Sequence, residues 1–525
     1  MPKGEETVVG IERELKFNLA SGAGAALSGH ALLRLAERLP PRRLQSWYFD
    51  TPERALAGVA VVLRLRDDGQ GRVVTVKTAP ADALGSERGE WEWAALDSPA
   101  CYRLGPRDLG RALRQTPLGR RLEAEPRDLL GRLAPSLGTD FRRSAWHLTW
   151  RASRLEVAFD QGACLALREG QVLRAPLGEL EIEVLQGDLA DAWDAAWALA
   201  QDLPLLLSPV PKAQRAAALL AGGLPEALPE PGALQRGATA RQAQAQWLQT
   251  GCAQLAVWGE RVVRGGQARD VHQLRVVLRR LRTALRWLAP RLPPGAAVWL
   301  RGELRWAHQL AGLARDHDVA LQWLGQVQPE AARSEALRWQ RRLRKTGAVA
   351  RQALVGYLGS PRFGRLLLAL ARCAQAGLPG DAGPAELRRL GRRALLGDAR
   401  QWRAALRDCA PLLRPEIDAG RIDERQTAQL HALRIASKRL RLSAERFGAL
   451  LDGRRCHDAL ASRRCATALQ THLGDWHDLD GLARRVEGGH GFGAQALREW
   501  LAERASAALR HAVEALRAPA DTAAG

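Results

Sequence analysis

The chain has 525 residues, 46% of them hydrophobic and 26% charged, which is typical of a globular protein with two or three domains. No apolar run approaches the roughly 20 residues of a membrane span, and the N-terminus lacks a secretory pattern, so no membrane contact is expected. The seven cysteines include no Cys-x-x-Cys pair, which favours reduced thiols and a cytoplasmic location. Lys and Arg number 78 against 57 Asp and Glu, and this net charge of +21 favours a polyanionic partner.

The first 185 residues are predicted to form strands, because charged and apolar residues alternate along several short segments. Residues two apart share one face of a strand, so the charges fall into rows. A solvated outer face would alternate in the same way, but surface strands usually mix the signs, whereas some of these rows are purely basic and others acidic. The rows are Glu12, Glu14 and Lys16; Arg64 and Arg66; Arg88, Glu90 and Glu92; and Glu179, Glu181 and Glu183, with Lys77 on a strand of its own.

Strand faces that carry both positive and negative side chains are suited to binding a triphosphate. Lys and Arg hold phosphate oxygens, whereas carboxylates repel them unless they carry a divalent cation that bridges protein and phosphate. A closed barrel with such a lining would bind the metal and the phosphate chain together and align a water for in-line attack on the terminal phosphorus.

The segment Glu12-Arg-Glu14-Leu-Lys16 resembles the ExExK signature of the CYTH, or triphosphate tunnel metalloenzyme, superfamily. The resemblance implies an antiparallel β-barrel that forms a tunnel, and a metal-dependent hydrolase of inorganic triphosphate. Further motifs similar to that family follow in order: Tyr48–Pro52, Arg64-Leu-Arg66, Lys77, Arg88-x-Glu90-x-Glu92, Arg143, Asp160 and Glu179–Glu183.

Roles for individual residues follow from this resemblance. Glu12, Glu14, Glu181 and Glu183 would hold Mg²⁺ or Mn²⁺, and Lys16 would act with Glu12 and Glu14 at the reacting end. Glu90 and Asp160 could instead orient a basic neighbour through a salt bridge. Pro211 departs from the Ser-x-x-Lys-x-x-Arg segment of bacterial members, which gives Lys212 and Arg215 less weight. The implied phosphate-binding set is Arg64, Arg66, Lys77, Arg88, Glu90, Arg143 and Asp160.

The remainder is predicted to be helical, which makes the fold class α+β: a barrel over residues 1–221, a Pro/Gly-rich linker over 222–234, and an all-α domain over 235–517. Helix breaks are expected at Pro293-Pro294, Gly377–Gly383 and Gly488–Gly493. The helical half repeats itself: His272–Arg282 recurs as His431–Arg441 after 159 residues, and Arg315–Asp318 matches His477–Asp480 after 162. Two pseudo-symmetric bundles are therefore expected.

A basic stripe runs along one helix face in each copy, because its residues recur in steps of three and four. Surface helices commonly offset Arg with Glu four residues away, and neither stripe interior has such partners. An external anion is therefore expected, with the Asp-x-Asp motifs orienting the cations. The stripes are His272, Arg275, Arg279, Arg282 and Arg286 in the first copy, and His431, Arg434, Lys438 and Arg441 in the second.

This duplicated pattern resembles the CHAD family, a helical domain often fused behind CYTH. The resemblance implies binding of inorganic polyphosphate in a basic channel, and with it an association with polyphosphate granules. Nucleic acid is a less favoured partner, because no helix-turn-helix, zinc-finger or RNP signature is visible. Two alternatives stay open: a polyphosphate-targeting protein with little catalysis, and a nucleoside triphosphatase or adenylate cyclase. The sequence does not assign a role to His317 or the cysteines.

Overall fold

The computed structural model describes residues 8–517 except 20, 123–125, 228, 230, 231, 233, 376–382, 415, 487 and 489. The chain divides into two compact units. The first comprises Met1–Pro229, Gln249–Gly265 and Tyr357–Arg372, and the second comprises Glu230–Leu248, Gly266–Gly356 and Cys373–Gly525.

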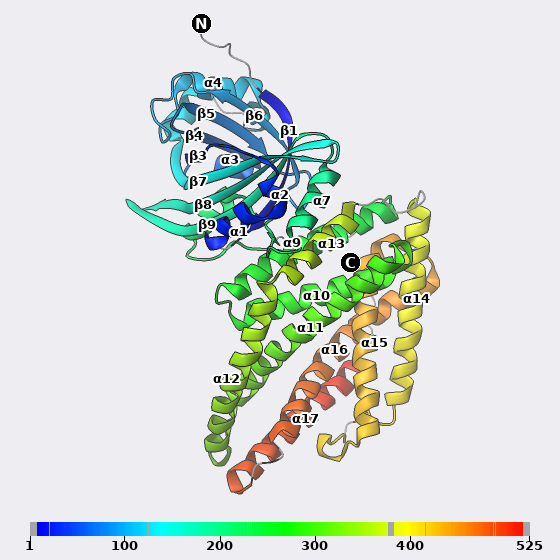
Figure 1. Ribbon diagram of the computed structural model, residues 1–525. Coiled ribbons are helices and arrows are strands. Elements are labelled where there is room, and N and C mark those ends of the chain that lie inside the picture. The colour runs from blue at the N-terminus through cyan, green and yellow to red at the C-terminus, as the bar shows by residue number, and fades with distance from the viewer. Residues whose placement is uncertain are drawn as a thin grey trace. The chain divides into compact units, whose positions relative to one another are not determined.

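The first unit is built on a closed antiparallel barrel (Figure 1). Its ring runs β1-β6-β5-β4-β3-β7-β8-β9 and closes where β9 pairs with β1, while β2 and β10 add short pairings to β7 and β1. Closure leaves none of the eight ring strands with a free edge. The strands are β1 (Val8–Asn18), β2 (Glu37–Arg38), β3 (Arg42–Asp50), β4 (Val61–Asp67), β5 (Arg72–Thr78), β6 (Glu87–Ala94), β7 (Ala134–Trp150), β8 (Ser153–Arg168), β9 (Gln171–Gln186) and β10 (Leu206–Leu207).

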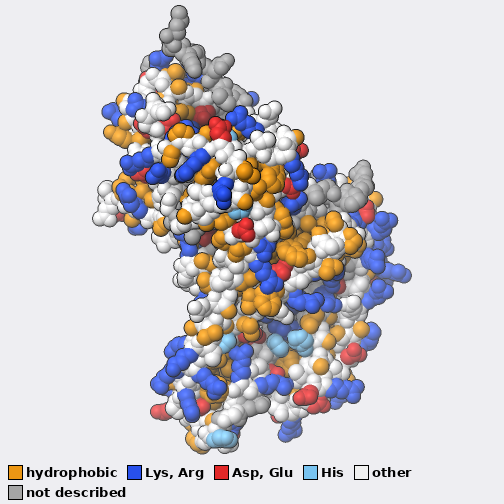
Figure 2. Space-filling view, viewed as in Figure 1, with side chains coloured by type: hydrophobic (Ala, Val, Ile, Leu, Met, Phe, Trp, Pro, Cys, Tyr) orange, Lys and Arg blue, Asp and Glu red, His pale blue; other side chains and the backbone are white. Residues whose placement is uncertain are grey.

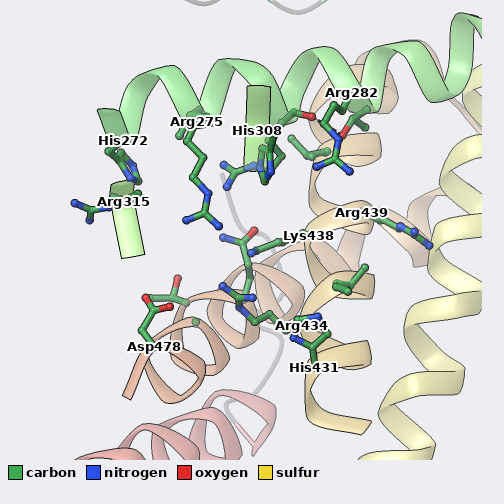
Figure 3. A pocket seen from close by; sticks show the side chains of 18 of the residues that line it. His272, Arg275, Arg282, His308, Arg315, His431, Arg434, Lys438, Arg439 and Asp478 are labelled. Carbon is green, nitrogen blue, oxygen red and sulfur yellow. Dashed lines mark hydrogen bonds between the residues drawn. The ribbon is translucent and has the colours of Figure 1, made fainter. Parts of the chain in front are cut away.

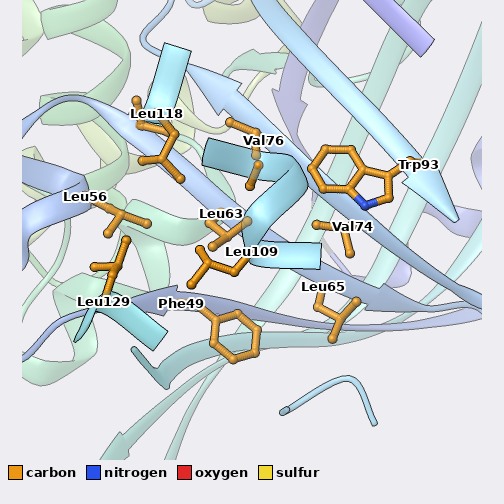
Figure 4. Packing of buried hydrophobic residues seen from close by; sticks show 12 residues of the cluster. Phe49, Leu56, Leu63, Leu65, Val74, Val76, Trp93, Leu109, Leu118 and Leu129 are labelled. Atoms are coloured by element: carbon orange, nitrogen blue, oxygen red, sulfur yellow. The ribbon is translucent and has the colours of Figure 1, made fainter. Parts of the chain in front are cut away.

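The alternation of side chains along the strands decides what lies inside the barrel. Arg64 and Arg66 of β4 line the interior, whereas Leu63 and Leu65 are fully buried in a cluster on the outer face. Leu109 and Leu118 cover that cluster from helices α4 (Pro106–Gln115) and α5 (Pro117–Leu122) (Figure 4). The apolar core of this part of the barrel therefore lies outside the strands, which leaves the interior to charged residues.

Short helices complete this unit. They are η1 (Ser21–Ala23), α1 (Gly24–Gly29), α2 (Ala31–Arg34), α3 (Ala55–Gly58), α4 (Pro106–Gln115), α5 (Pro117–Leu122), α6 (Pro126–Arg132), α7 (Leu189–Leu199) and α8 (Lys212–Leu220).

The rest of the chain is helical. Its elements are α9 (Ala240–Val263), α10 (Ala268–Leu288), η2 (Ala289–Arg291), α11 (Pro294–Leu324), α12 (Glu330–Leu358), α13 (Pro361–Gln375), α14 (Pro384–Cys409), η3 (Ala419–Arg421), α15 (Glu424–Phe447), η4 (Gly448–Leu450), α16 (Arg454–Val486) and α17 (Phe492–Arg517).

The sequence repeat corresponds to a repeated pair of helices in the second unit. The two copies of the basic stripe lie on α10 and α15, and the Asp-x-Asp motifs lie on α11 and α16. Three aromatic rings pack together in its core, with centroids 5.6 Å apart for Trp247 and Trp287 and 4.8 Å apart for Trp287 and Phe447. The α+β class, the barrel and the helical second half are thus confirmed.

The predicted helix breaks fare as follows. Pro294 begins α11, and Gly488–Gly493 spans the end of the gap between α16 and α17. The break predicted at Gly377–Gly383 lies, except for Gly383, outside the described residues.

Two glycines of α14 differ in their surroundings, so substitutions at them test the packing of this core. A Cβ at Gly391 would lie 2.7 Å from Cδ1 of Phe447, whereas a Cβ at Gly397 would meet nothing within 4 Å. Gly391→Ala should therefore destabilise the protein by about 1–3 kcal/mol through overpacking. The control Gly397→Ala should stabilise it by about 0.5–1 kcal/mol, because alanine favours the helix. Thermal unfolding of both variants measures the difference, and equal melting temperatures would contradict the close packing on Phe447.

Candidate functional site

The barrel interior is a cavity of about 230 Å³, called here the tunnel cavity. Among the described residues, eight Lys or Arg and eight Asp or Glu line it, so that the two signs balance when all are ionised. Of the residues that the sequence assigned to this site, all line the cavity except Asp160. The cations are Lys16, Arg42, Arg64, Arg66, Lys77, Arg88, Arg143 and Lys212, and the acids are Glu12, Glu14, Asp68, Glu90, Glu92, Glu156, Glu181 and Glu183.

Strand register places opposite charges beside each other. Glu12 of β1 is opposite Arg88 of β6, and Lys77 of β5 is opposite Glu90. Lys77 Nζ donates to Glu12 Oε1 at 2.7 Å, and Arg88 Nε donates to Glu12 Oε2 at 2.6 Å. Burial alone would raise the pKa of Glu12, but Lys77 and Arg88 outweigh it and hold that pKa well below its usual range. Glu12 is therefore an ionised carboxylate with cations on both oxygens.

Glu14 and Glu181 are engaged in the same way. Lys16 Nζ and Arg88 Nη2 both donate to Glu14 Oε1, and Arg143 Nη2 donates to Glu181 Oε2. These contacts give each carboxylate a cationic partner, which offsets the cost of burying its charge.

Glu183 differs from the other carboxylates. It lies opposite Glu14 in the pairing of β1 with β9 and opposite Glu156 in the pairing of β8 with β9. Burial, followed by repulsion from Glu12, Glu14 and Glu181, raises the pKa of Glu183 to about 8. The cavity thus has an excess of acidic groups around Glu183.

This excess bears on the metal expected from the sequence. No group of three or more His, Cys, Asp or Glu in the described part of the chain is arranged to hold a metal ion. The reason is visible in the contacts, because Glu12, Glu14 and Glu181 each bind Lys or Arg. The donor chemistry nevertheless fits Mg²⁺ or Mn²⁺, which prefer carboxylate oxygens, and the repulsion at Glu183 is what a bound cation would relieve.

Asp160 is placed differently from the rest of the predicted phosphate-binding set. It is fully buried and does not line the cavity. Arg143 donates to it twice, from Nε and Nη2 at 2.7 Å each, and Lys212 Nζ lies 2.8 Å from Oδ2. Asp160 is opposite Arg143 in the β7–β8 pairing, so this register turns its carboxylate to the guanidinium. Its position is that of a residue that orients Arg143, the other role that the sequence left open.

Lys212 carries less weight as a site residue in the sequence because Pro211 precedes it. It begins α8 directly after the extended Pro211 and lines the cavity. Its Nζ lies 2.6 Å from Oε1 of both Glu179 and Glu181, and these acids with Asp160 outweigh burial and raise the pKa of Lys212 well above its usual range. The departure at Pro211 therefore does not remove this lysine from the site.

Arg215, one turn further along α8, is held by Glu260 of α9. Its Nη1 donates to Glu260 Oε1 at 2.8 Å, and Asn18 Nδ2 donates to the other carboxylate oxygen at 3.0 Å. Sequence reasoning missed Glu260, because a contact across 45 residues leaves no local pattern. It also missed Glu156, whose signal was present: it is a charged residue in an apolar strand, in phase with Asp160.

A second cavity lies in the helical unit and measures about 800 Å³ (Figure 3). We call it the basic pocket, because ten Lys or Arg and two Asp of the described residues line it. The cations are Arg275, Arg279, Arg282 and Arg286 of α10, Arg301, Arg305 and Arg315 of α11, and Arg434, Lys438 and Arg439 of α15; the acids are Asp475 and Asp478 of α16.

Both predicted stripes meet in this pocket. In Figure 3, Arg275 of α10 points toward Lys438 of α15. His272 and His431 also line the pocket, whereas Arg441 does not. Arg441 Nη1 instead lies 3.6 Å from Glu445, one turn further along α15.

The Asp-x-Asp motifs orient the stripes only in part. Asp316 lies 3.4 Å from Arg275 of the stripe, but Asp318 binds Arg351 and Asp480 binds Arg484. His317 bonds within its own surroundings, to the Leu313 carbonyl and the Thr346 hydroxyl.

Two glycines show how the arginines are accommodated. A Cβ at Gly312 of α11 would lie 4.0 Å from Arg275 Nε, and a Cβ at Gly474 of α16 would lie 4.0 Å from Arg434 Nε. The two glycines are 162 residues apart, the same offset as the Asp-x-Asp motifs. Each copy of the repeat thus has a small residue where a stripe arginine crosses the facing helix.

The crowding of cations lowers their pKa values. Burial, followed by repulsion from Arg434, Arg279 and Arg275, lowers the pKa of Lys438 to about 7, although Asp478 opposes the change. Burial and repulsion from Arg441 lower the pKa of Arg279 to about 10, and burial and Arg275 lower the pKa of His308 to about 3. The pocket therefore carries positive charge that its own acids do not neutralise.

Comparison with known proteins also finds two different domains in the chain. Residues 10–217 match the family model of the CYTH domain, and residues 246–487 match that of the CHAD domain. The chain therefore combines a CYTH domain with a CHAD domain, as the motifs predicted.

Three relatives illustrate the similarity. The inorganic triphosphatase of Haemophilus influenzae is 28% identical over 176 residues, which are 33% of this chain and 44% of that protein, so less than half of the relative is spanned. The CHAD domain of the plant Ricinus communis is 24% identical and covers 56% of this chain and 95% of that one, with a TM-score of 0.41. A proposed adenylyl cyclase from Hippeastrum with a dominant triphosphatase activity is 20% identical and covers 41% of this chain and 97% of that one, with a TM-score of 0.29.

Within the described residues, no helix combines the length and the apolar character needed to cross a membrane.

The pKa of Lys438 predicts how anion binding depends on pH. Below pH 7 the ammonium is present in both the free and the bound pocket, so Lys438 should not change the affinity there. Above pH 7 the free lysine is neutral while a bound polyanion keeps it protonated, so affinity should fall by up to about tenfold per pH unit. Lys438→Arg should flatten the profile between pH 7 and about 9, because the guanidinium stays charged.

Titration with inorganic polyphosphate at several pH values measures this dependence. Lys345→Arg on the exposed face of α12 is the control and should keep the wild-type profile. A wild-type affinity that stays constant above pH 7, or a decline that Lys438→Arg leaves intact, would contradict the assignment to Lys438.

Proposed function

We propose that the protein hydrolyses inorganic triphosphate in the tunnel cavity with Mg²⁺ or Mn²⁺, and that it binds inorganic polyphosphate in the basic pocket. In this proposal residues 1–221 form the catalytic domain and residues 235–517 the polyphosphate-binding domain. The observation that carries it is the contrast in charge, eight cations with eight acids in the first cavity and ten with two in the second.

The balanced lining explains why the tunnel would need a metal. A triphosphate brings several negative charges, and a cavity without net charge does not attract it strongly. Glu12, Glu14, Glu181 and Glu183 would supply oxygen ligands to a divalent cation, which when bound neutralises charge on the phosphate chain. The metal dependence of triphosphate tunnel enzymes supports this assignment.

The ion pairs suggest how the residues would respond. If the carboxylates turned to a metal, Lys77 and Arg88 would lose Glu12, and Arg143 would lose Glu181 but keep Asp160. These cations would then have donor groups available for phosphate oxygens, as would Arg64 and Arg66. Metal and triphosphate should therefore bind cooperatively, because each provides new partners for groups that the other displaces.

Catalysis would rest on positioning and charge. The closed barrel limits access of bulk water, and its cations fix the phosphate chain for in-line attack by a water. Lys16, on the same face of β1 as Glu12 and Glu14, would stabilise charge at the reacting phosphate. Asp160 would act indirectly by orienting Arg143.

The pocket needs no metal in this proposal. Its cations exceed its acids by eight among the described lining residues, so that a polyanion can bind by direct ion pairs. Polyphosphate carries a charge on every phosphorus and is thin and flexible enough to enter a cavity between helices. The match to the CHAD family supports polyphosphate as the ligand.

The double variant Glu12→Gln, Glu14→Gln tests the tunnel. It should lose metal-dependent phosphate release from tripolyphosphate by roughly a hundredfold or more while remaining folded. ATP and thiamine triphosphate assayed beside tripolyphosphate distinguish an inorganic triphosphatase from a nucleoside triphosphatase. Mn²⁺ titrations should show tighter binding when tripolyphosphate is present.

Glu87→Gln is the matched control, because Glu87 lies on β6 beside Arg88 but does not line the cavity. It should keep wild-type turnover. Unchanged turnover in the double variant would refute the tunnel as the active site, and Mn²⁺ affinity that tripolyphosphate does not alter would refute the exchange of partners.

A four-residue variant tests the pocket. Changing Arg275, Arg279, Arg434 and Lys438 to Ala should weaken polyphosphate binding far more than binding of duplex DNA, because a rigid duplex cannot enter the pocket. Competition at matched phosphate concentration should favour polyphosphate strongly for the wild type. Equal competition by DNA, or equal losses for both ligands, would mean that the cations act as an open surface.

A further inference from the structure

A third cluster of cations lies outside both cavities, on helix α14. Its groove measures about 650 Å³ and runs between α14 and the start of α16. The residues that line this α14 groove are Arg389, Arg392, Arg393, Leu396, Arg400, Arg403, Arg455 and Asp458. In Figure 2, Lys and Arg side chains gather along the edge of the helical unit at which Figure 1 shows α14.

The arginines of α14 form one narrow face. Positions 389, 392, 393, 400 and 403 fall within a sector of about 100° when each residue turns the helix by about 100°. From the first to the last they extend along about 21 Å of the helix axis. They thus form a linear row of cations rather than a compact cluster.

The row is largely without acidic partners. Arg389 lies 3.8 Å from Glu386, but no described acidic residue forms an ion pair with Arg392, Arg393, Arg400 or Arg403. Like charges three and four residues apart on a helix destabilise it by repulsion. An external polyanion would remove this cost, whereas an inert surface would leave it in place.

The composition of the groove indicates what kind of polyanion fits. Among the described residues that line it, none is aromatic, and none is Asn or Gln. Aromatic side chains commonly stack on bases, and Asn or Gln pair with adenine, so the groove lacks these two means of recognising bases. A phosphate polymer without bases needs only the guanidinium groups that are present.

The helix also connects the groove to the basic pocket. Arg286 and Arg439, which line the pocket, donate to Asp398 and Gln401 of α14. Asp398 points away from the arginine row, about 160° from Arg400 around the helix axis. One face of α14 therefore supports the pocket, while the other carries the groove.

We propose that the α14 groove is a second binding site for inorganic polyphosphate, which engages long chains that are also held in the basic pocket. This inference rests on the proposed function of the pocket. A chain that reaches both sites binds with an increased effective concentration, whereas a short chain occupies one site at a time. The groove thus makes the protein select for chain length.

The test compares full-length proteins and two probes, polyphosphate of roughly ten and of roughly one hundred phosphates. The groove variant is Arg392→Gln, Arg393→Gln, Arg400→Gln, Arg403→Gln. The control variant is Arg333→Gln, Arg341→Gln, Arg344→Gln, Lys345→Gln, which removes the same charge from exposed positions of α12. The groove variant should lose roughly tenfold or more in affinity for the long chain and keep its affinity for the short one. The control should bind both probes like the wild type.

The outcomes separate the two claims. Binding of the short chain by the wild type reports on the pocket, and its absence would refute the proposed function. A long-chain affinity that is the same in the groove and control variants would overturn the inference alone. So would a groove variant that loses affinity for duplex DNA but not for long polyphosphate, which would assign the groove to nucleic acid.

Discussion

The closure of an antiparallel barrel is the constraint on which the site depends. Because side chains alternate and no ring strand has a free edge, every second residue of eight strands points into one enclosed space. Most charged residues in that space are buried or half-buried, so they need partners there. Register supplies those partners, with Arg88 opposite Glu12, Glu90 opposite Lys77 and Asp160 opposite Arg143. The result is a tunnel whose charges are numerous and nearly all compensated.

In the helical unit, by contrast, the charges that line the basic pocket are not balanced. Its stripes come from two copies of one helix, so the repeat brings like charges face to face. Burial, followed by that repulsion, lowers the pKa values of Lys438 and Arg279, just as burial, followed by the neighbouring acids, raises the pKa of Glu183 in the tunnel. The proposed function follows from this contrast, with a cation and an anion together in the tunnel cavity and an anion alone in the basic pocket.

Much of this arrangement was predictable from the sequence, because it follows from spacing. Period-two rows placed Glu12, Glu14, Lys16, Arg64 and Arg66 in the tunnel, and period-3.6 stripes placed both sets of helical cations in one pocket. The remainder depends on contacts between distant segments, which leave no local signal. The burial of Asp160 behind Arg143, the engagement of Lys212 with three acids and the pairing of Arg215 with Glu260 are of this kind. Arg441 shows the converse, because it satisfies the stripe spacing but pairs with Glu445 of its own helix.

The central claim is that the two sites differ in their need for a metal because they differ in charge balance. The most direct measurement follows both activities of one sample while divalent cations are removed with a chelator. The account predicts that phosphate release from tripolyphosphate stops, while the affinity for polyphosphate stays unchanged. Hydrolysis that persists without divalent cations, or polyphosphate binding that disappears with them, would contradict it.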